Sequence, residues 1–93
     1  MTGKRTKKVI ISGKVQGVFY RLETQKAARQ AGVAGYVKNL ADGSVEAVFQ
    51  GPPEAVDQMV AWCHQGPPAA RVDQVIDDVA PSQTDFKDFE VRY

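Results

Sequence analysis

One segment of the sequence, residues 13–21 (GKVQGVFYR), joins a glycine-containing loop to an arginine at the start of a predicted helix. The first backbone N–H groups of a helix have no partner within it, and the helix dipole adds positive character, so such a junction attracts anions. Gly17 permits a tight, concave backbone here, and the guanidinium of Arg21 is a planar donor suited to phosphate. We therefore expect an anion site, with an ordinary connecting loop and a solvated arginine as the alternative.

Arg21 stands where the helix dipole disfavours a cation, because the N-terminal end of a helix is itself positive. A sequence that keeps an arginine there can be using its charge for an incoming anion. The segment lacks the Gly-Lys-Ser/Thr ending of the phosphate loop of nucleotide-binding enzymes. The expected anion site is therefore of another kind.

A second candidate is Asn39, at the end of a strand expected at residues 33–40. A strand-helix-strand crossover leaves its two strands parallel, so the end of this strand lies level with the loop at residues 13–21. Asparagine is disfavoured inside strands, and its amide both donates and accepts hydrogen bonds. Asn39 can therefore hold a water beside a bound phosphate. The alternative is that it only shapes the turn at Asp42-Gly43.

Short apolar segments separated by glycine and proline predict the elements that position these residues. Helices are expected at residues 21–31 and 53–65, and strands at residues 8–12, 33–40, 44–50, 71–79 and 89–93. The pair Asp42-Gly43 predicts a hairpin turn, whereas the register of residues 71–79 cannot be read from their poor alternation. The order predicts an α+β fold of the ferredoxin-like split βαβ type (β-α-β-β-α-β plus a C-terminal edge strand), with two helices on one face of a mostly antiparallel sheet.

Each predicted helix has one apolar face. In the first, Thr24, Ala28 and Ala31 share a face, and these small side chains allow close approach to a sheet. In the second, Cys63 lies on the apolar face and is expected in the core. Its neighbour His64 points elsewhere, because adjacent residues of a helix do not face each other, so a catalytic Cys/His pair is not expected.

Composition indicates a single globular domain. The chain has 93 residues, of which 43% are hydrophobic and 25% charged, values typical of soluble domains and not of disordered, collagen-like or coiled-coil chains. No apolar run approaches the ~20 residues that span a bilayer, and VIIS after the basic N-terminus is too short for a signal peptide. One cysteine and one histidine exclude a disulfide framework and a conventional structural zinc site. The single cysteine fits a reducing compartment, so we expect a cytoplasmic protein.

Charge is unevenly distributed along the chain. The net charge is +1, but Lys4, Arg5, Lys7 and Lys8 provide four of the 12 basic residues, which leaves eight basic against 11 acidic residues beyond them, or −3. That balance argues against a nucleic-acid partner, which favours a strongly basic domain. We expect residues 1–7 to form a flexible basic N-terminal tail and residues 8–93 to form the domain. Small size and the absence of an obvious apolar patch predict a monomer.

Two segments resemble the signatures of the acylphosphatase family. Residues 13–21 (GKVQGVFYR) resemble the first, and residues 35–46 (GYVKNLADGSVE) resemble the second at the family's spacing. The likeness extends from about Lys7 to Tyr93. Tyr20 stands where the family more often has phenylalanine, and Tyr36 where it more often has tryptophan, so the departures concern packing rather than chemistry.

The resemblance implies hydrolysis of a small-molecule acyl phosphate to a carboxylate and inorganic phosphate, without metal or cofactor. It implies that Arg21 and Asn39 are the catalytic residues, with Asn39 orienting the attacking water. A bound phosphate or sulfate is expected to contact Arg21 and the backbone amides of Val15, Gln16, Gly17, Val18, Phe19 and Tyr20. Because almost nothing lies beyond the domain, we expect a stand-alone enzyme that does not act on a membrane.

Two other functions remain open from the sequence. One is a noncatalytic anion-binding or regulatory module of the same fold, since acylphosphatase-like domains also occur inside larger proteins. The other is single-stranded RNA binding, for which Tyr36 and Phe49 could stack bases on the sheet. The RNA-recognition consensus is absent and the body of the chain is acidic, so hydrolysis is the leading hypothesis.

Overall fold

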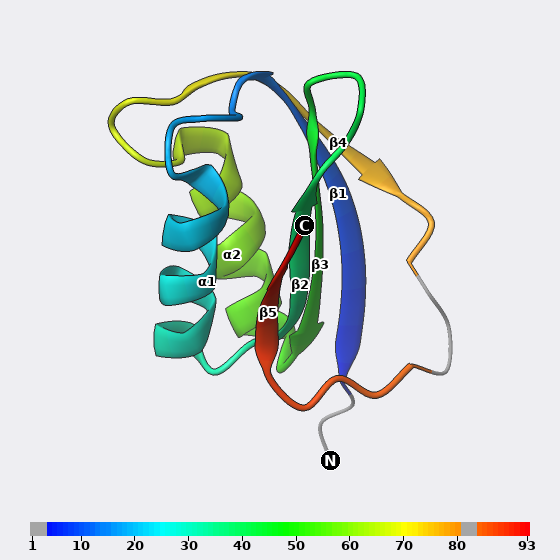
Figure 1. The fold of residues 1–93 in the computed structure, drawn as a ribbon. Helices are drawn as coiled ribbons and strands as arrows, with labels where there is room; N and C mark the ends of the chain where they lie inside the picture. The colour runs from blue at the N-terminus through cyan, green and yellow to red at the C-terminus, as the bar shows by residue number, and fades with distance from the viewer. Residues whose placement is uncertain (1–3, 81–83) are drawn as a thin grey trace.

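The computed structural model describes residues 4–80 and 84–93, which form five strands and two helices (Figure 1). The first signature segment lies between a strand and a helix, and the second begins in a strand and crosses a hairpin. The elements are β1 (Arg5–Lys14), α1 (Tyr20–Ala31), β2 (Ala34–Asn39), β3 (Val45–Gly51), α2 (Pro53–Gln65), β4 (Arg71–Asp78) and β5 (Phe89–Arg92).

The strands form one sheet in the order β4-β1-β3-β2-β5. β3 is antiparallel to both β1 and β2, so β1 and β2 run in the same direction, as the crossover predicts. β5 pairs in parallel with β2 at one edge, and β4 pairs antiparallel with β1 at the other. The predicted ferredoxin-like α+β fold, with a C-terminal edge strand, is confirmed.

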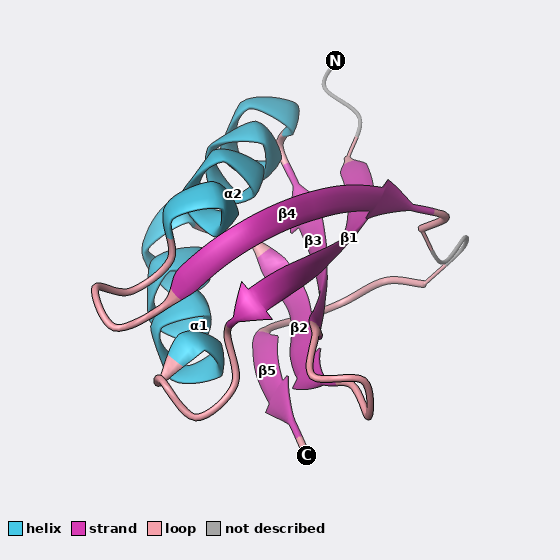
Figure 2. Cartoon of the chain, turned by 90° about the horizontal axis from the view of Figure 1, so that it is seen from above, coloured by secondary structure: helices cyan, strands magenta, loops and turns pink. Residues whose placement is uncertain are grey.

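Both helices cover the same face of the sheet (Figures 1 and 2). The core lies between these layers and is built from alternate strand residues such as Val9, Ile11 and Phe49, all fully buried. On α1 the small side chains Thr24 and Ala28 are also fully buried, which lets this helix lie close to the sheet. Alternation of period two in the strands and an apolar face on each helix therefore produce a two-layer domain.

The other face of the sheet is partly covered by the chain segment before β5. The Gln50 side chain donates to the Thr6 hydroxyl at 2.9 Å and to the Thr84 carbonyl, and it accepts from the Phe86 amide at 2.9 Å. The ring of Phe86 lies 6.0 Å from that of Tyr36. As a result, every residue of β3 is buried, including the polar residues that the alternation predicts on the outer face.

β1 begins at Arg5, three residues before the start expected at Lys8, so residues 5–7 pair with β3 in the sheet. Thr6 accepts the hydrogen bond from Gln50, and Lys7 pairs with Asp77 at 3.1 Å. The sequence did not predict this extension, because residues 5–7 are polar and carry no alternation. Residues 1–3 of the expected tail lie outside the described residues.

The register between β1 and β4 shifts after Ser12, where Gly13 pairs with Val72. Gly13 has a φ of 125°, and a side chain there would place its Cβ 2.2 Å from the Arg71 carbonyl oxygen. Only glycine fits at this bulge. The shift also explains why the alternation of β4 was not readable from the sequence.

Cys63 is fully buried as a free thiol, as predicted. In the described part of the chain, no helix is long and apolar enough to cross a membrane. Nor do the described residues bring together three or more acidic, histidine or cysteine side chains in a way that could hold a metal ion.

Candidate active site

In the loop between β1 and α1, every second or third side chain is buried in the core of the domain. Val15, Val18 and Tyr20 are buried in the core, whereas Gly17 and Phe19 are exposed. This pattern leaves the backbone at the surface while its ends are fixed. The loop is therefore a rigid surface feature, as a preorganised binding site requires.

The backbone of this loop contains two residues in the left-handed conformation. Gly17 has a φ of 74° and Phe19 a φ of 64°, and Val18 between them is not in the positive-φ region. Left-handed residues of this kind are typical of backbone concavities whose successive N–H groups bind anions. Nothing lies within 4 Å of a Cβ built on Gly17, so the backbone conformation and not lack of space requires glycine there.

The backbone N–H groups of residues 15–20 make no hydrogen bond to any residue that the structure describes. The side chain of Phe19, the N-cap of α1, does not cap the helix either. Backbone donors are normally paired, with water or a ligand where protein offers no acceptor. This run of free donors at a helix N-terminus is suited to a bound anion.

The Gln16 side chain connects this loop to the hairpin that follows Asn39. Its Nε2 donates to the carbonyl oxygens of Leu40 and Ser44, each at 2.8 Å. The hairpin is closed by its own bonds, including that from the Ser44 amide to the Asp42 carboxylate at 3.0 Å. Gln16 therefore sets the distance between the two signature segments.

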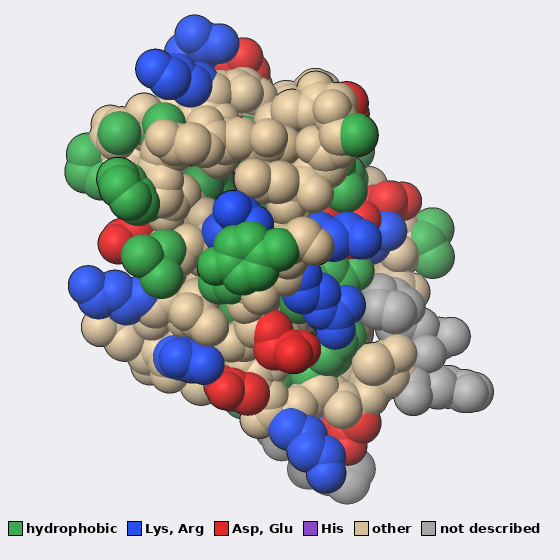
Figure 3. All heavy atoms as spheres, in the orientation of Figure 1, with side chains coloured by type: hydrophobic (Ala, Val, Ile, Leu, Met, Phe, Trp, Pro, Cys, Tyr) green, Lys and Arg blue, Asp and Glu red, His purple; other side chains and the backbone are tan. Residues whose placement is uncertain are grey.

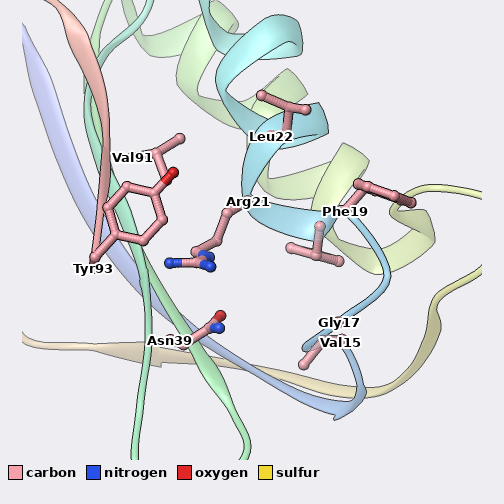
Figure 4. A pocket seen from close by; sticks show the side chains of 9 residues that line it. Val15, Gly17, Phe19, Arg21, Leu22, Asn39, Val91 and Tyr93 are labelled. Carbon is pink, nitrogen blue, oxygen red and sulfur yellow. The ribbon is translucent and has the colours of Figure 1, made fainter.

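Asn39 is the last residue of β2 and faces the loop from across the sheet edge (Figure 4). Its Oδ1 atom is buried and has no hydrogen-bond partner among residues 4–80 and 84–93. A buried polar atom without a partner is costly unless a water or ligand satisfies it. The turn is shaped by Asp42 and Ser44, so the interpretation that Asn39 only supports the turn loses its basis.

Arg21 lies in the first turn of α1, and its guanidinium points into the space between Asn39 and the C-terminus (Figure 4). Its Nη1 donates to the Arg92 carbonyl oxygen at 3.0 Å. One face of the guanidinium is covered by the Tyr93 ring, whose centroid is 4.6 Å from Cζ. These contacts use one donor and one face, which leaves the other N–H groups for a ligand.

The two signatures meet in a pocket of about 310 Å³. Of the residues predicted to bind phosphate, Gln16 and Val18 do not line this pocket, and their side chains face the hairpin and the core. Arg21 is the single charged side chain in the lining. The lining residues are Val15, Gly17, Phe19, Tyr20, Arg21, Leu22, Asn39, Val91 and Tyr93.

Sequence reasoning missed the contribution of Leu22, Val91 and Tyr93 to this pocket. The alternation at the C-terminus predicts a strand, but not which edge of the sheet it joins. Because β5 runs parallel to β2, its end lies beside the end of β2, where Asn39 is found. Placement of β5 beside β2 is the signal that would have identified Val91 and Tyr93, whereas Leu22 directly follows Arg21 on α1.

The site is neutral apart from Arg21, and its supporting aromatic is held uncharged. Burial, together with the hydrogen bond of 2.8 Å from its hydroxyl to the Cys63 carbonyl oxygen, raises the pKa of Tyr20 far above its usual range. One fixed cation and a run of free amides in a lining with no other charged side chain can hold a small dianion. It can also place an attacking water on Asn39.

Comparison with known proteins points to one family. The acylphosphatase family model matches residues 7–91. An acylphosphatase of Geobacter sulfurreducens is 53% identical over 85 residues, covering 91% of this chain and 93% of its own. One from Rubrobacter xylanophilus is 50% identical over 93 residues, covering 98% and 84%.

A solved structure extends the likeness to the fold. The crystal structure of an acylphosphatase from Bacillus subtilis superposes with a TM-score of 0.88 at 32% identity, covering 95% of this chain and 98% of its own. Sequence and fold agree over nearly the whole length, and the chain belongs to the acylphosphatase family.

Proposed function

We propose that this enzyme hydrolyses acyl phosphates by holding the phosphoryl group on Arg21 and the backbone amides of residues 15–20, while Asn39 orients the attacking water. One observation carries the assignment. In a single pocket, a run of unpaired backbone donors lies beside Arg21 and opposite the buried, unpartnered Oδ1 of Asn39.

An acyl phosphate is a mixed anhydride, so its hydrolysis needs little help at the leaving group. The oxygen of water attacks phosphorus, the bond from phosphorus to the acyl oxygen breaks, and the electron pair leaves on the carboxylate. Carboxylates have a pKa of about 4, so the leaving oxygen needs no proton. The water's proton passes to a phosphate oxygen, and no strong general base is required.

The chain's own groups then provide position and charge. The phosphoryl transition state is loose and carries its charge on the equatorial oxygens, where fixed N–H donors stabilise it. Arg21 is held in place by the Arg92 carbonyl oxygen and the Tyr93 ring before substrate arrives. Asn39 Oδ1 accepts a hydrogen bond from the water and aims its lone pair at phosphorus. An alkyl phosphate ester, with a far more basic leaving group, is a poor substrate by the same reasoning.

The test measures acetyl phosphate hydrolysis and phosphate binding in the same variants. Arg21→Ala is expected to lower kcat/KM by about a thousandfold or more and to weaken phosphate binding. Asn39→Ala is expected to lower kcat by about a hundredfold while phosphate binding persists. Arg29→Ala is the matched control, because Arg29 is exposed at the other end of α1 and pairs with Asp88 at 3.0 Å.

Three results would contradict these roles. Full activity of either site variant would remove that residue from the mechanism. Phosphate binding by the parent protein without turnover of any acyl phosphate would instead favour the noncatalytic anion-binding or regulatory module. An oligonucleotide bound at moderate salt would favour RNA binding, although Figure 3 shows basic and acidic side chains interspersed on the face it displays.

We also propose that the enzyme is a cytoplasmic monomer. Its single cysteine is buried as a free thiol, which suits a reducing compartment. Light scattering at micromolar concentration tests the monomer, and a dimer mass would contradict it.

A further inference from the structure

The pocket has an apolar rim that phosphate binding alone does not explain. The structure describes five exposed large hydrophobic residues, and three of them line this one pocket: Phe19 is 74% exposed, Leu22 56% and Tyr93 fully exposed. The remaining two, Ile76 and Val79, lie in and just after β4. Exposed apolar side chains that gather around a polar site indicate a ligand with an apolar part.

Phe19 and Tyr93 place their aromatic rings at the rim of the pocket. Phe19 is the non-glycine residue with positive φ in the described part of the chain, at 64°, a conformation that costs about 1 kcal/mol or more and is found at functional sites. The Phe19 residue that adopts this conformation has its ring exposed and not in the core. Tyr93 is the last residue, and its ring is held over the Arg21 guanidinium. Leu22 follows Arg21 directly on α1, so all three lie beside the phosphate site.

The charges of the lining set a second limit. Arg21 is the single charged side chain among the nine that line the pocket, and the phosphoryl group uses it. A second anionic group on the substrate would lie against the apolar part of the lining. It would lose hydrating water there without gaining an ion-pair partner from the side chains of the pocket. Desolvating an unpaired charge is strongly unfavourable.

We propose that the site prefers acyl phosphates whose acyl group is apolar and uncharged, with that group lying against Phe19, Leu22 and Tyr93. This inference rests on the proposed function, because the phosphoryl group must first occupy the Arg21 site. The rim acts on binding and not on the bond that breaks. Its contribution appears in KM and kcat/KM, and the inhibition constant of inorganic phosphate does not depend on it.

The first experiment compares acetyl, butyryl and hexanoyl phosphate on the parent enzyme. Their carboxylic acids have nearly equal acidity, so the chemical step is held constant while apolar area grows. Each methylene that leaves water is expected to raise kcat/KM by about twofold to fourfold. Benzoyl phosphate is then compared with 4-carboxybenzoyl phosphate, and the extra carboxylate is expected to lower kcat/KM by about tenfold.

The second experiment changes the rim. Leu22→Gln keeps a good helix former and removes the apolar contact, so the hexanoyl-to-acetyl ratio of kcat/KM is expected to fall by about threefold or more. Phe19→Asn removes the ring but tolerates positive φ, and the same fall is expected. Ile76→Gln is the matched control, because Ile76 is 48% exposed on β4 and does not line the pocket. Urea denaturation verifies that each variant has folded, and the inhibition constant of phosphate is expected to match the parent's in the Leu22→Gln protein.

The outcomes separate this inference from the proposed function. Equal kcat/KM along the alkyl series, or a ratio unchanged in both rim variants, overturns the apolar preference while hydrolysis stands. Faster turnover of the carboxylated substrate overturns it as well. Failure of the parent to hydrolyse any of the five compounds refutes the proposed function itself.

Discussion

Tyr20 shows how one hydroxyl connects the site to the rest of the domain. It is the first residue of α1, directly before Arg21, and its hydroxyl donates to the Cys63 carbonyl oxygen at 2.8 Å. That carbonyl belongs to the last turn of α2, where carbonyl groups have no partner within the helix. Its ring also lies 5.6 Å from that of Trp62. One side chain therefore joins the start of one helix to the end of the other.

We expect Tyr20→Phe to lower the free energy of unfolding by about 1 kcal/mol, because a buried carbonyl loses its donor. Urea denaturation measures the change. Tyr93→Phe is the control, since the Tyr93 side chain is fully exposed and the loss of its hydroxyl leaves no buried group unpaired. Equal stability of the Tyr20→Phe protein and its parent would mean that water replaces the hydroxyl.

At the scale of elements, the Gln16 amide makes the two side-chain hydrogen bonds that join the β1–α1 loop to the β2–β3 hairpin among the described residues. Gln16→Leu keeps the size of the side chain and removes both hydrogen bonds. We expect kcat/KM for acetyl phosphate to fall by about tenfold, since small displacements of positioned groups are costly to catalysis. The hairpin carbonyls lose their donor as well, so a smaller loss of stability accompanies the change.

Gln58→Leu is the matched control for Gln16→Leu, because Gln58 is an exposed glutamine of α2. Urea denaturation shows whether the Gln16→Leu protein is folded, and so whether a fall in its activity comes from unfolding. A folded Gln16→Leu protein with the parent's kcat/KM would show that the loop holds its position without this link.

The sequence predicted the order of the strands and helices, but not where β1 starts, which edge of the sheet β5 joins, or the contacts between elements. Glycine and proline separate the segments, so the order of strands and helices, and the closeness of Arg21 and Asn39, followed from crossover rules. The start of β1 at Arg5 and the edge that β5 joins were not predicted, because both depend on tertiary pairing. The bond from Arg21 to the Arg92 carbonyl oxygen could not be foreseen, since a backbone acceptor has no signature in the sequence.

Across the whole molecule, a polar network on the sheet face opposite the helices joins all five strands. Glu46 of β3 accepts from the Tyr36 hydroxyl of β2 at 2.7 Å and pairs with Lys8 of β1 at 3.3 Å. Lys8 also pairs with Asp78 of β4 at 3.5 Å. The Arg92 guanidinium of β5 lies 4.0 Å from the Tyr36 ring centroid. Since the Arg92 carbonyl oxygen accepts a hydrogen bond from Arg21, this network also supports the strand end that positions Arg21.

Glu46 makes the stability of the whole domain depend on pH. Burial would raise the pKa of its carboxyl, but the hydrogen bonds and charges of Tyr36, Lys8 and Lys38 outweigh burial and lower it. Burial and the bond to Glu46 in turn raise the pKa of Tyr36 to about 12, so Tyr36 remains a donor at neutral pH. A carboxyl with a lowered pKa in the folded state stabilises the fold above its unfolded pKa of about 4.3, and this stabilisation is lost as the pH falls through the folded value.

We therefore expect Glu46→Gln to lower the free energy of unfolding by about 1 to 2 kcal/mol at pH 7, and by progressively less as the pH approaches 3. Other carboxyl groups titrate alike in both proteins and cancel in the difference. Urea denaturation of parent and variant at several pH values measures it, with Glu54→Gln on the exposed start of α2 as the control. A difference that stays constant from pH 7 to pH 3 would mean that Glu46 stabilises the fold by packing and not by its charge. A stabilisation that comes from the ionised Glu46 carboxylate beside Lys8 and Lys38 must disappear when Glu46 is protonated.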